Sequence, residues 1–339
     1  MENGARPLPA ARTRWGILPA MTQSKLDALR SQLEQVIVGQ SALIDRLIVT
    51  LLAGGHVLLE GPPGLAKTTA VHALASAIDA SYQRIQFTPD LMPADLLGSE
   101  IFEPGNGGFR FIPGPIFHEI LLADEINRAP PKVQSALLEA MAEHQVTVAG
   151  ETRHLPDIFI VLATQNPLEQ AGTYPLPEAQ LDRFLFKLVL DYPSLEEEVE
   201  IARRARQVAE GHLEAAVEAQ LKPADILLLR REVDAVFIEP RLERYAVELV
   251  AATRNVARFD TAWEGVVTAG ASPRGSIALL RAAMARAFLE GRDYVLPEDI
   301  VELAPDVLRH RLVMSFSAEA QGIGADRIIA TLIDRIAAP

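Results

Sequence analysis

The sequence of 339 residues contains no cysteine. Disulfides, thiolate metal sites and cysteine nucleophiles are therefore excluded, and the composition does not point to an oxidising compartment. No run approaches the ~18 uninterrupted apolar residues of a membrane span, and the N-terminal stretch lacks the apolar segment of a signal peptide. We therefore expect a cytoplasmic protein without membrane insertion.

Positive charge is also scarce, because 32 Lys and Arg stand against 45 Asp and Glu, for a net charge of −13. This balance argues against wide non-specific binding to nucleic acid or anionic membranes, although a basic stripe inside a channel could hide within it. The 7 His residues show no metal-ligand spacing, so we interpret each as a structural or surface histidine. With 49% apolar and 23% charged residues, the chain is long enough for two domains with buried cores.

Apolar strand-like runs alternate with helical segments in the first half of the chain. The pattern predicts strands at 57–60, 82–87, 119–125 and 157–165, and helices at 37–54, 68–79 and 131–144. Such alternation predicts a parallel sheet covered by helices.

The pattern changes after Tyr192. Ser194 and Glu197 predict a capping box that opens a helix through about Val208. Further helices are predicted at 224–236, 240–257, 275–290, 297–309 and 324–336. We therefore expect a flexible tail at 1–22, an α/β core at 23–191 and an all-helical domain at 192–339.

The stretch GPPGLAKTT, residues 61–69, lies between an apolar strand and a helix. It nearly matches the phosphate-binding pattern G-x-x-x-x-G-K-[ST], with Ala66 in place of the second glycine. In such a loop, backbone N–H groups and the helix N-terminus surround the phosphates, Lys67 reaches the outer phosphates and the Thr68 hydroxyl takes Mg²⁺. We expect a negative φ at Ala66 and the tighter turn at Gly64. A Gly/Pro turn between any strand and helix is the alternative.

Polar residues also end the later strands. Asp124 and Glu125 suit a phosphoryl-transfer site, in which one carboxylate helps to hold Mg²⁺ and the second polarises the attacking water. Asn166 follows the strand at 157–165 and could orient water near a γ-phosphate, and Arg183 follows in the apolar context LDRF. Taken singly, the acidic pair could cap a sheet, Asn166 could form a turn, and Arg183 could be a surface cation.

Together these stretches resemble the AAA+ ATPases, and specifically the MoxR type. The matching segments follow the family's order from about Ile37 to about Leu312: GPPGLAKT, LLADEINRAPPKVQSALLEAM, QVTV, ATQNP, PLPEAQLDRF and GASPRGSIALLRAAMARAFLEGRDYVLPEDI. MoxR-type loops carry Ala before the Lys, so Ala66 agrees with this branch. The resemblance implies an α/β fold, an AAA+ P-loop core with a parallel sheet flanked by helices, followed by an all-helical lid domain.

The resemblance also implies roles for single residues. The nucleotide-binding residues would be Gly61, Pro62, Pro63, Gly64, Leu65, Ala66, Lys67, Thr68 and Thr69. Thr68 and Asp124 would hold the metal, and the catalytic group would comprise Glu125, the first sensor Asn166, the arginine finger Arg183 and the lid's second sensor Arg274. Residues 88–117 resemble the branch's insertion in the second core helix, and 143–154 its hairpin before the first-sensor strand.

The resemblance implies an ATP-hydrolysing remodelling chaperone with ATP and Mg²⁺ as cofactors and a homo-oligomeric, usually hexameric ring. Its partners would be a protein client and a protein with a von Willebrand factor type A domain, and metal-cofactor insertion is a further family role. The alternatives are a nucleic-acid motor, as in related branches with the same insertion, and a nucleotide-gated switch with little hydrolysis.

Basic residues separate these alternatives. The 88–117 segment carries only Arg110 and the 143–154 segment only Arg153 as Lys or Arg, which is poor for a phosphate track. We therefore expect no nucleic-acid partner. The presence of the predicted catalytic carboxylate, first sensor and finger disfavours the switch.

Overall fold

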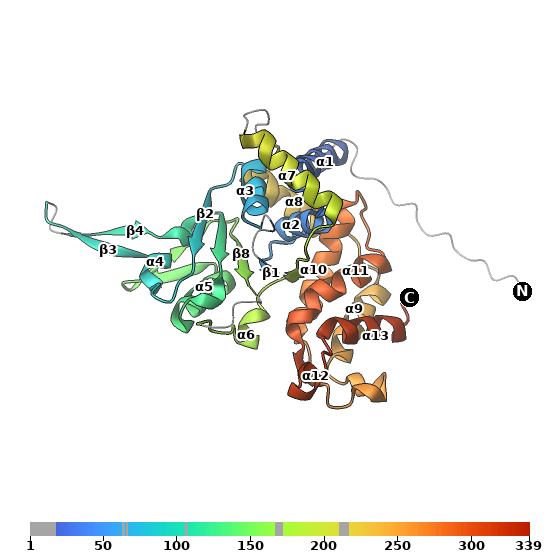
Figure 1. Ribbon diagram of the computed structural model, residues 1–339. Coiled ribbons are helices and arrows are strands. Elements are labelled where there is room, and N and C mark those ends of the chain that lie inside the picture. Colours follow the sequence, from blue (N-terminus) through green and yellow to red (C-terminus); the bar gives the residue numbers. More distant parts are fainter. Residues whose placement is uncertain (1–17, 63–64, 66, 106–107, 167–171, 210–216) are drawn as a thin grey trace, which may run out of the picture.

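The computed structural model describes residues 18–62, 65, 67–105, 108–166, 172–209 and 217–339 (Figure 1). At its centre is a 5-stranded sheet in the order β2-β5-β8-β1-β9, in which all neighbours pair in parallel. The strands are β1 (Val57–Glu60), β2 (Tyr82–Gln86), β5 (Ile120–Asp124), β8 (Ile160–Gln165) and β9 (Phe186–Val189). The predicted parallel sheet is confirmed.

Helices cover both faces of the sheet because the strands alternate between two apolar faces. Val57 and Leu59 of β1 belong to one buried cluster, which includes α2 (Ser41–Ala53) and α3 (Lys67–Ala77). Leu58 belongs to the other cluster, which includes α5 (Pro131–Glu143). The sheet therefore lies between two helical layers, and its strand ends remain available for a site.

A helix that the sequence did not predict precedes α2. The helix α1 covers Leu18–Val36, so residues 18–22 begin a helix and do not belong to a flexible tail. Its buried stripe is Leu26, Leu29 and Leu33, and this spacing buries one face of a helix against the core. The prediction of a tail is therefore corrected for 18–22, and residues 1–17 lie outside the described part of the chain.

Helices predominate after β9, as predicted. They are α7 (Leu195–Ala209), α8 (Pro223–Val233), α9 (Pro240–Ala252), α10 (Pro273–Leu289), α11 (Pro297–Leu308), α12 (Phe316–Ala320) and α13 (Ala325–Arg335). The predicted capping box is present at α7, where Ser194 N donates to Glu197 Oε2 (2.8 Å) and Glu197 N to Ser194 Oγ (3.3 Å). One departure is a short antiparallel pair, β10 (Val267–Ala269) with β11 (Val313–Met314).

Helix α9 is shorter than predicted. It ends at Ala252, not at 257, and the Thr253 hydroxyl donates to Val250 O (2.6 Å) at its end. Thr253 Oγ1 also accepts from Ala271 N (2.9 Å), a long-range contact that turns the chain and that the local pattern cannot reveal.

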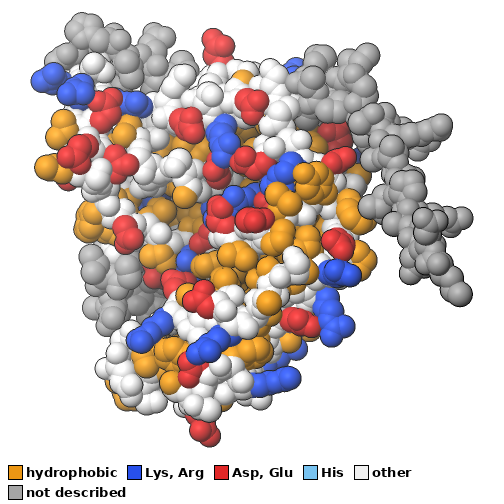
Figure 2. Space-filling view, turned by 90° about the vertical axis from the view of Figure 1, so that its right-hand side faces the viewer, with side chains coloured by type: hydrophobic (Ala, Val, Ile, Leu, Met, Phe, Trp, Pro, Cys, Tyr) orange, Lys and Arg blue, Asp and Glu red, His pale blue; other side chains and the backbone are white. Residues whose placement is uncertain are grey.

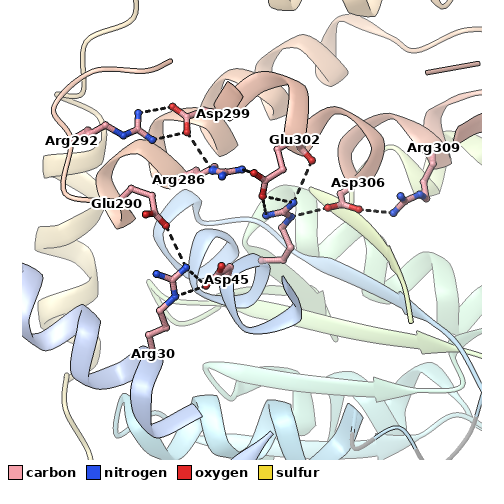
Figure 3. Close-up of polar contacts among 10 residues, drawn as sticks. Arg30, Asp45, Arg286, Glu290, Arg292, Asp299, Glu302, Asp306 and Arg309 are labelled. Carbon is pink, nitrogen blue, oxygen red and sulfur yellow. Dashed lines mark hydrogen bonds and ion pairs between the residues drawn. The ribbon is translucent and has the colours of Figure 1, made fainter. Parts of the chain in front are cut away.

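Ion pairs join the N-terminal helices to the C-terminal ones (Figure 3). Arg46 of α2 contacts Asp306 (2.7 Å) and Glu302 (3.3 Å) of α11. Arg30 of α1 contacts Asp45 (2.6 Å) and, at the end of α10, Glu290 (3.3 Å). Helices α1 and α2 are therefore held against the C-terminal helical region.

Two hairpins extend from the α/β region. The 88–117 segment contains α4 (Pro93–Leu97), β3 (Gly98–Glu103) and β4 (Gly108–Pro113), and the hairpin β3–β4 projects from the body in Figure 1. The 143–154 segment contains β6 (Gln145–Val148) and β7 (Glu151–His154). Arg153 of β7 lies 3.9 Å over the ring of Phe111 in β4, so a cation–π contact joins the hairpins.

Charges of both signs are intermixed on the face shown in Figure 2, where Lys and Arg do not gather into one basic area outside the grey atoms. Among the described residues, no helix combines the length and the apolar character that a bilayer span requires.

Candidate functional site

A cavity of about 460 Å³ opens at the carboxyl ends of β5 and β8, beside the start of α3. The carboxyl edge of a parallel sheet is the usual ligand position in such folds. The lining residues are Leu65, Lys67, Thr68, Thr69, Arg84, Gln86, Asp124, Glu125, Thr164, Gln165 and Asn166. The structure thus brings together Leu65 and residues 67–69 of the predicted loop, the acidic pair and Asn166, whereas Gly61 and Pro62 are not among the lining residues.

The predicted phosphate loop connects β1 to α3. Gly61 has no room for a side chain, because a Cβ there would lie 2.7 Å from Leu190 O. Lys67, the first residue of α3, donates from Nζ to Gly61 O (2.8 Å). Burial lowers the pKa of Lys67, while Asp124 and Glu125 act to raise it. A lysine that donates to a neutral carbonyl in this way can exchange that carbonyl for an anion.

Part of the loop lies outside the described residues, namely Pro63, Gly64 and Ala66. The expected tight turn at Gly64 and the negative φ at Ala66 therefore stay predictions.

Asp124 at the end of β5 is held by two neighbouring strands. Its Oδ1 accepts from Thr164 Oγ1 (2.5 Å) of β8, and its Oδ2 accepts from Arg84 Nη2 (2.6 Å) of β2. Thr164 Oγ1 also accepts from Glu125 N (2.8 Å), so one hydroxyl orders both acidic residues. Sequence reasoning did not assign roles to Arg84 and Thr164, whose contacts depend on the strand order.

Glu125 has unusual backbone geometry, with φ 56° and ψ 51° in the left-handed region. Such a conformation is uncommon for a residue with a Cβ and is often found at functional sites. Its Oε2 accepts from Gln86 Nε2 (2.7 Å) and from Arg128 Nη1 (2.9 Å). Gln86 was also missed, although the alternation of Arg84 and Gln86 along β2 places both on one face. Both bonds end on Oε2, so they restrain the Glu125 carboxylate through one of its two oxygens.

Arg183 and Arg274 lie elsewhere, and neither is among the described residues that line the cavity. Arg183 lies in the turn after α6 (Glu178–Leu181), and the exposed Arg274 lies in the first turn of α10. Asp182 links the two segments, because its Oδ2 accepts from Oγ of Ser272 (2.8 Å), the N-cap residue of α10. The segments that carry the two predicted arginines are therefore joined to each other, and neither arginine lines the cavity.

No group of three or more His, Asp or Glu residues that could hold a metal ion occurs among the described residues. A cation at this site would need ligands from the Thr68 hydroxyl, Asp124 and a bound phosphate. This donor set suits Mg²⁺, which usually takes one or two carboxylates together with substrate phosphates.

The strand–loop–helix with its lysine, facing an acidic strand end across a parallel sheet, defines a P-loop nucleotide-binding domain. Comparison with known families agrees. Residues 56–186 match the model of the ATPase family associated with various cellular activities (AAA), and residues 260–332 match that of the AAA lid domain.

Relatives narrow the assignment. The chain is 46% identical over 312 residues to "Chaperone MoxR1" of Mycobacterium tuberculosis, covering 91% of this chain and 81% of that one. It is 35% identical over 316 residues to "Protein MoxR" of Paracoccus denitrificans, covering 89% and 91%. A crystal structure of a candidate ATPase from Cytophaga hutchinsonii matches with a TM-score of 0.88 and 46% identity, covering 95% of this chain and 97% of that one. The chain therefore belongs to the MoxR family of AAA+ ATPases.

Proposed function

We propose that this protein is an ATP-hydrolysing remodelling chaperone that acts as a ring, with its ATP sites between subunits.

 The proposal rests on one observation: the segments that carry Arg183 and Arg274 are joined to each other, and neither arginine lines the cavity that holds Lys67, Asp124 and Glu125. Arginines outside the pocket of their own chain can serve the pocket of a neighbour. The AAA+ family is typically oligomeric, and a six-membered ring is its usual form.

The cavity suits ATP with Mg²⁺. The N-terminus of α3 and the Lys67 ammonium favour phosphate oxygens, and Thr68 and Thr69 add hydroxyls. Thr68 and Asp124 would hold the metal, which supplies charge neutralisation at the phosphates when bound. On binding of the triphosphate, Lys67 would exchange Gly61 O for phosphate oxygens.

Hydrolysis would use the groups at the strand ends. Glu125 would leave Gln86 and Arg128 and accept a proton from the attacking water, which Asn166 would help to orient. Arg183 of the adjacent subunit would stabilise the charge that spreads over the γ-phosphate, an effect of roughly 10³ or more in rate. Arg274 would approach the same phosphates from the same edge.

We propose that 23–191 act as the nucleotide-binding core and 192–339 as the lid. The hairpin β3–β4 would contact a client protein, since Phe102 and Phe109 are 55% and 71% exposed on it. A protein with a von Willebrand factor type A domain would be the partner, the site of action would be the cytoplasm, and metal-cofactor insertion would be one form of client maturation.

The hairpins give little support to a nucleic-acid motor. Arg110 contacts Glu103 (2.6 Å), and Arg153 contacts Glu151 (2.6 Å) as well as the ring of Phe111. Both cations thus already have an acidic neighbour, and a phosphate backbone would have to compete with it.

A mixing experiment tests the proposed function. Arg183→Ala keeps the pocket and Lys67→Ala keeps the finger, so each protein alone should be nearly inactive. Titration of one with the other should restore partial ATP turnover, because some interfaces then join an intact pocket to an intact finger. Normal hydrolysis by Arg183→Ala, or a specific activity that does not change from dilute monomer to assembled ring, would exclude a finger acting between subunits.

A further inference from the structure

Arg311 is a buried arginine whose contacts surround the predicted finger. Its side chain is 2% exposed, and it lies in the 3₁₀ turn Arg309–Arg311 after α11. Its Nη2 donates to Asp182 O (3.1 Å) and to Phe184 O (2.8 Å), the carbonyls directly before and after Arg183. Its Nε donates to Asp182 Oδ1 (2.8 Å). One guanidinium thus fixes the backbone on both sides of Arg183.

Asp182 extends this arrangement to the start of α10. Its Oδ1 accepts from Arg311 and its Oδ2 accepts from Ser272 Oγ (2.8 Å). Ser272 Oγ in turn accepts from Arg274 N (3.1 Å), as the N-cap of the helix. A continuous chain of bonds therefore runs from the backbone around Arg183 to the backbone of Arg274.

The packing leaves room for this arrangement. Gly275 faces Arg311, and a Cβ there would lie 3.3 Å from Arg311 Cδ, tighter than most such contacts. No described residue accepts a hydrogen bond from the buried Nε of Arg183. The turn is thus held by bonds to its backbone and to Asp182, while Arg183 Nε keeps its donor for another group.

We propose that Arg311, Asp182 and Ser272 are positioning residues, which hold Arg183 and Arg274 as one preorganised pair that acts on the phosphates of a neighbouring subunit. This inference rests on the proposed function and adds the residues that set the geometry of the finger. We call Arg311, Asp182 and Ser272 the mount of the two arginines. Misplacement of a catalytic group by about 1 Å can lower a rate by about a hundredfold, so the geometry that the mount fixes has a direct kinetic consequence.

Three variants test the mount in the full-length protein. Asp182→Ala should lower kcat for ATP about tenfold to hundredfold with little change in KM, because the pocket itself is intact. Ser272→Ala removes the bonds of Ser272 Oγ to Asp182 and to Arg274 N but keeps those of Arg311, so it should have a smaller effect of the same kind. Asp306→Ala is the matched control, since Asp306 and Asp182 are both 16% exposed and both pair with buried arginines. Asp306 lies on α11 and its contacts do not include the turn at Arg183, so this variant should keep kcat.

Mixed rings distinguish positioning from general damage. Asp182→Ala should be rescued by Lys67→Ala, which contributes an intact finger, and should not be rescued by the double variant Lys67→Ala/Asp182→Ala. A defect that follows the subunit donating the finger supports the mount, whereas a defect that stays with the subunit owning the pocket overturns it. If Asp182→Ala does not fold, Asp182→Asn and Ser272→Ala carry the same test.

The outcomes also separate this inference from the proposed function. If Arg183→Ala is inactive while Asp182→Ala and Ser272→Ala hydrolyse at the parent rate, the mount is wrong and the finger between subunits stands. If Arg183→Ala itself hydrolyses at the parent rate, the proposed function fails first.

Discussion

The pocket and the turn that carries Arg183, here called the finger turn, hold their charged groups in different ways. In the pocket, Asp124 pairs with Arg84, whose side chain is 48% exposed, and Glu125 pairs with Arg128, which is 41% exposed. At the turn, Asp182 pairs with Arg311, which is 2% exposed. Exposed pairs contribute little and exchange partners readily, whereas a buried pair is costly to break.

The difference fits two different tasks. A pocket that must admit a charged ligand benefits from groups whose present partners can be replaced. A group that must act on another molecule benefits from a fixed position, because its geometry then costs no reorganisation during the reaction. We therefore predict that nucleotide binding rearranges the pocket and leaves the finger turn unchanged.

The largest expected effect is on ATP turnover and concerns Glu125, one of the pocket residues whose present partners can be replaced. Glu125→Gln should keep ATP binding and lower kcat by roughly 10²–10⁴, since the amide preserves the shape but cannot accept a proton. Nucleotide titration and steady-state turnover measure the two properties separately. Glu119→Gln, in the residue before β5, is the control and should keep turnover. Hydrolysis by Glu125→Gln at the parent rate would reassign Glu125 to a structural role.

The pocket was more accessible to sequence reasoning than the finger turn. The loop, Asp124, Glu125 and Asn166 each follow a predicted strand, and the carboxyl ends of parallel strands meet at one edge. Their grouping could therefore be predicted before the strand order was known. Arg84 could have been found from its alternation with Gln86, but its contact with Asp124 depends on the pairing of β2 with β5.

The mount could not be predicted, because its bonds join residues far apart in the sequence. Asp182 and Arg311 are 129 positions apart, and Asp182 and Ser272 are 90 apart. Local periodicity carries no information on such contacts. The helix α1 was missed for a different reason: the spacing of Leu26, Leu29 and Leu33 was available, but the Pro- and Arg-rich residues before it suggested a longer tail.

Acid should weaken the buried region around the mount. His310 lies beside Arg311, and its Nε2 lies 3.1 Å from Phe184 O. Burial, followed by the charge of Arg311, lowers the pKa of His310 well below its ordinary value, and Lys187 and Arg309 act in the same direction. Burial likewise lowers the pKa of His56, next to β1, to about 3. Both histidines are therefore neutral in the folded protein.

The sign of the effect follows from proton binding. Below about pH 6.5 the unfolded chain binds protons at these histidines and the folded chain does not, so stability falls as the pH falls. We expect a loss of about 1 kcal/mol per pH unit for each histidine in urea unfolding between pH 6.5 and 5. His310→Gln should flatten this dependence. A slope that His310→Gln does not alter would show that His310 binds its proton over the same pH range in the folded and the unfolded chain.

The smallest expected effect concerns Arg84, which donates a hydrogen bond to Oδ2 of Asp124, whereas Thr164 donates to Oδ1. A cation that binds Asp124 must compete with this guanidinium, and an exposed ion pair contributes about 0.2–1 kcal/mol. Arg84→Ala should therefore lower the Mg²⁺ concentration for half-maximal ATP binding by up to about fivefold. Arg128→Ala is the matched control, because Arg128 pairs with Glu125 and is similarly exposed, so its removal should leave the Mg²⁺ dependence unchanged. Titration of Mg²⁺ against a fluorescent ATP analogue measures both. If Arg84→Ala instead weakens nucleotide binding at saturating Mg²⁺, Arg84 contacts the phosphates directly, and the pocket then contains a second fixed cation beside Lys67.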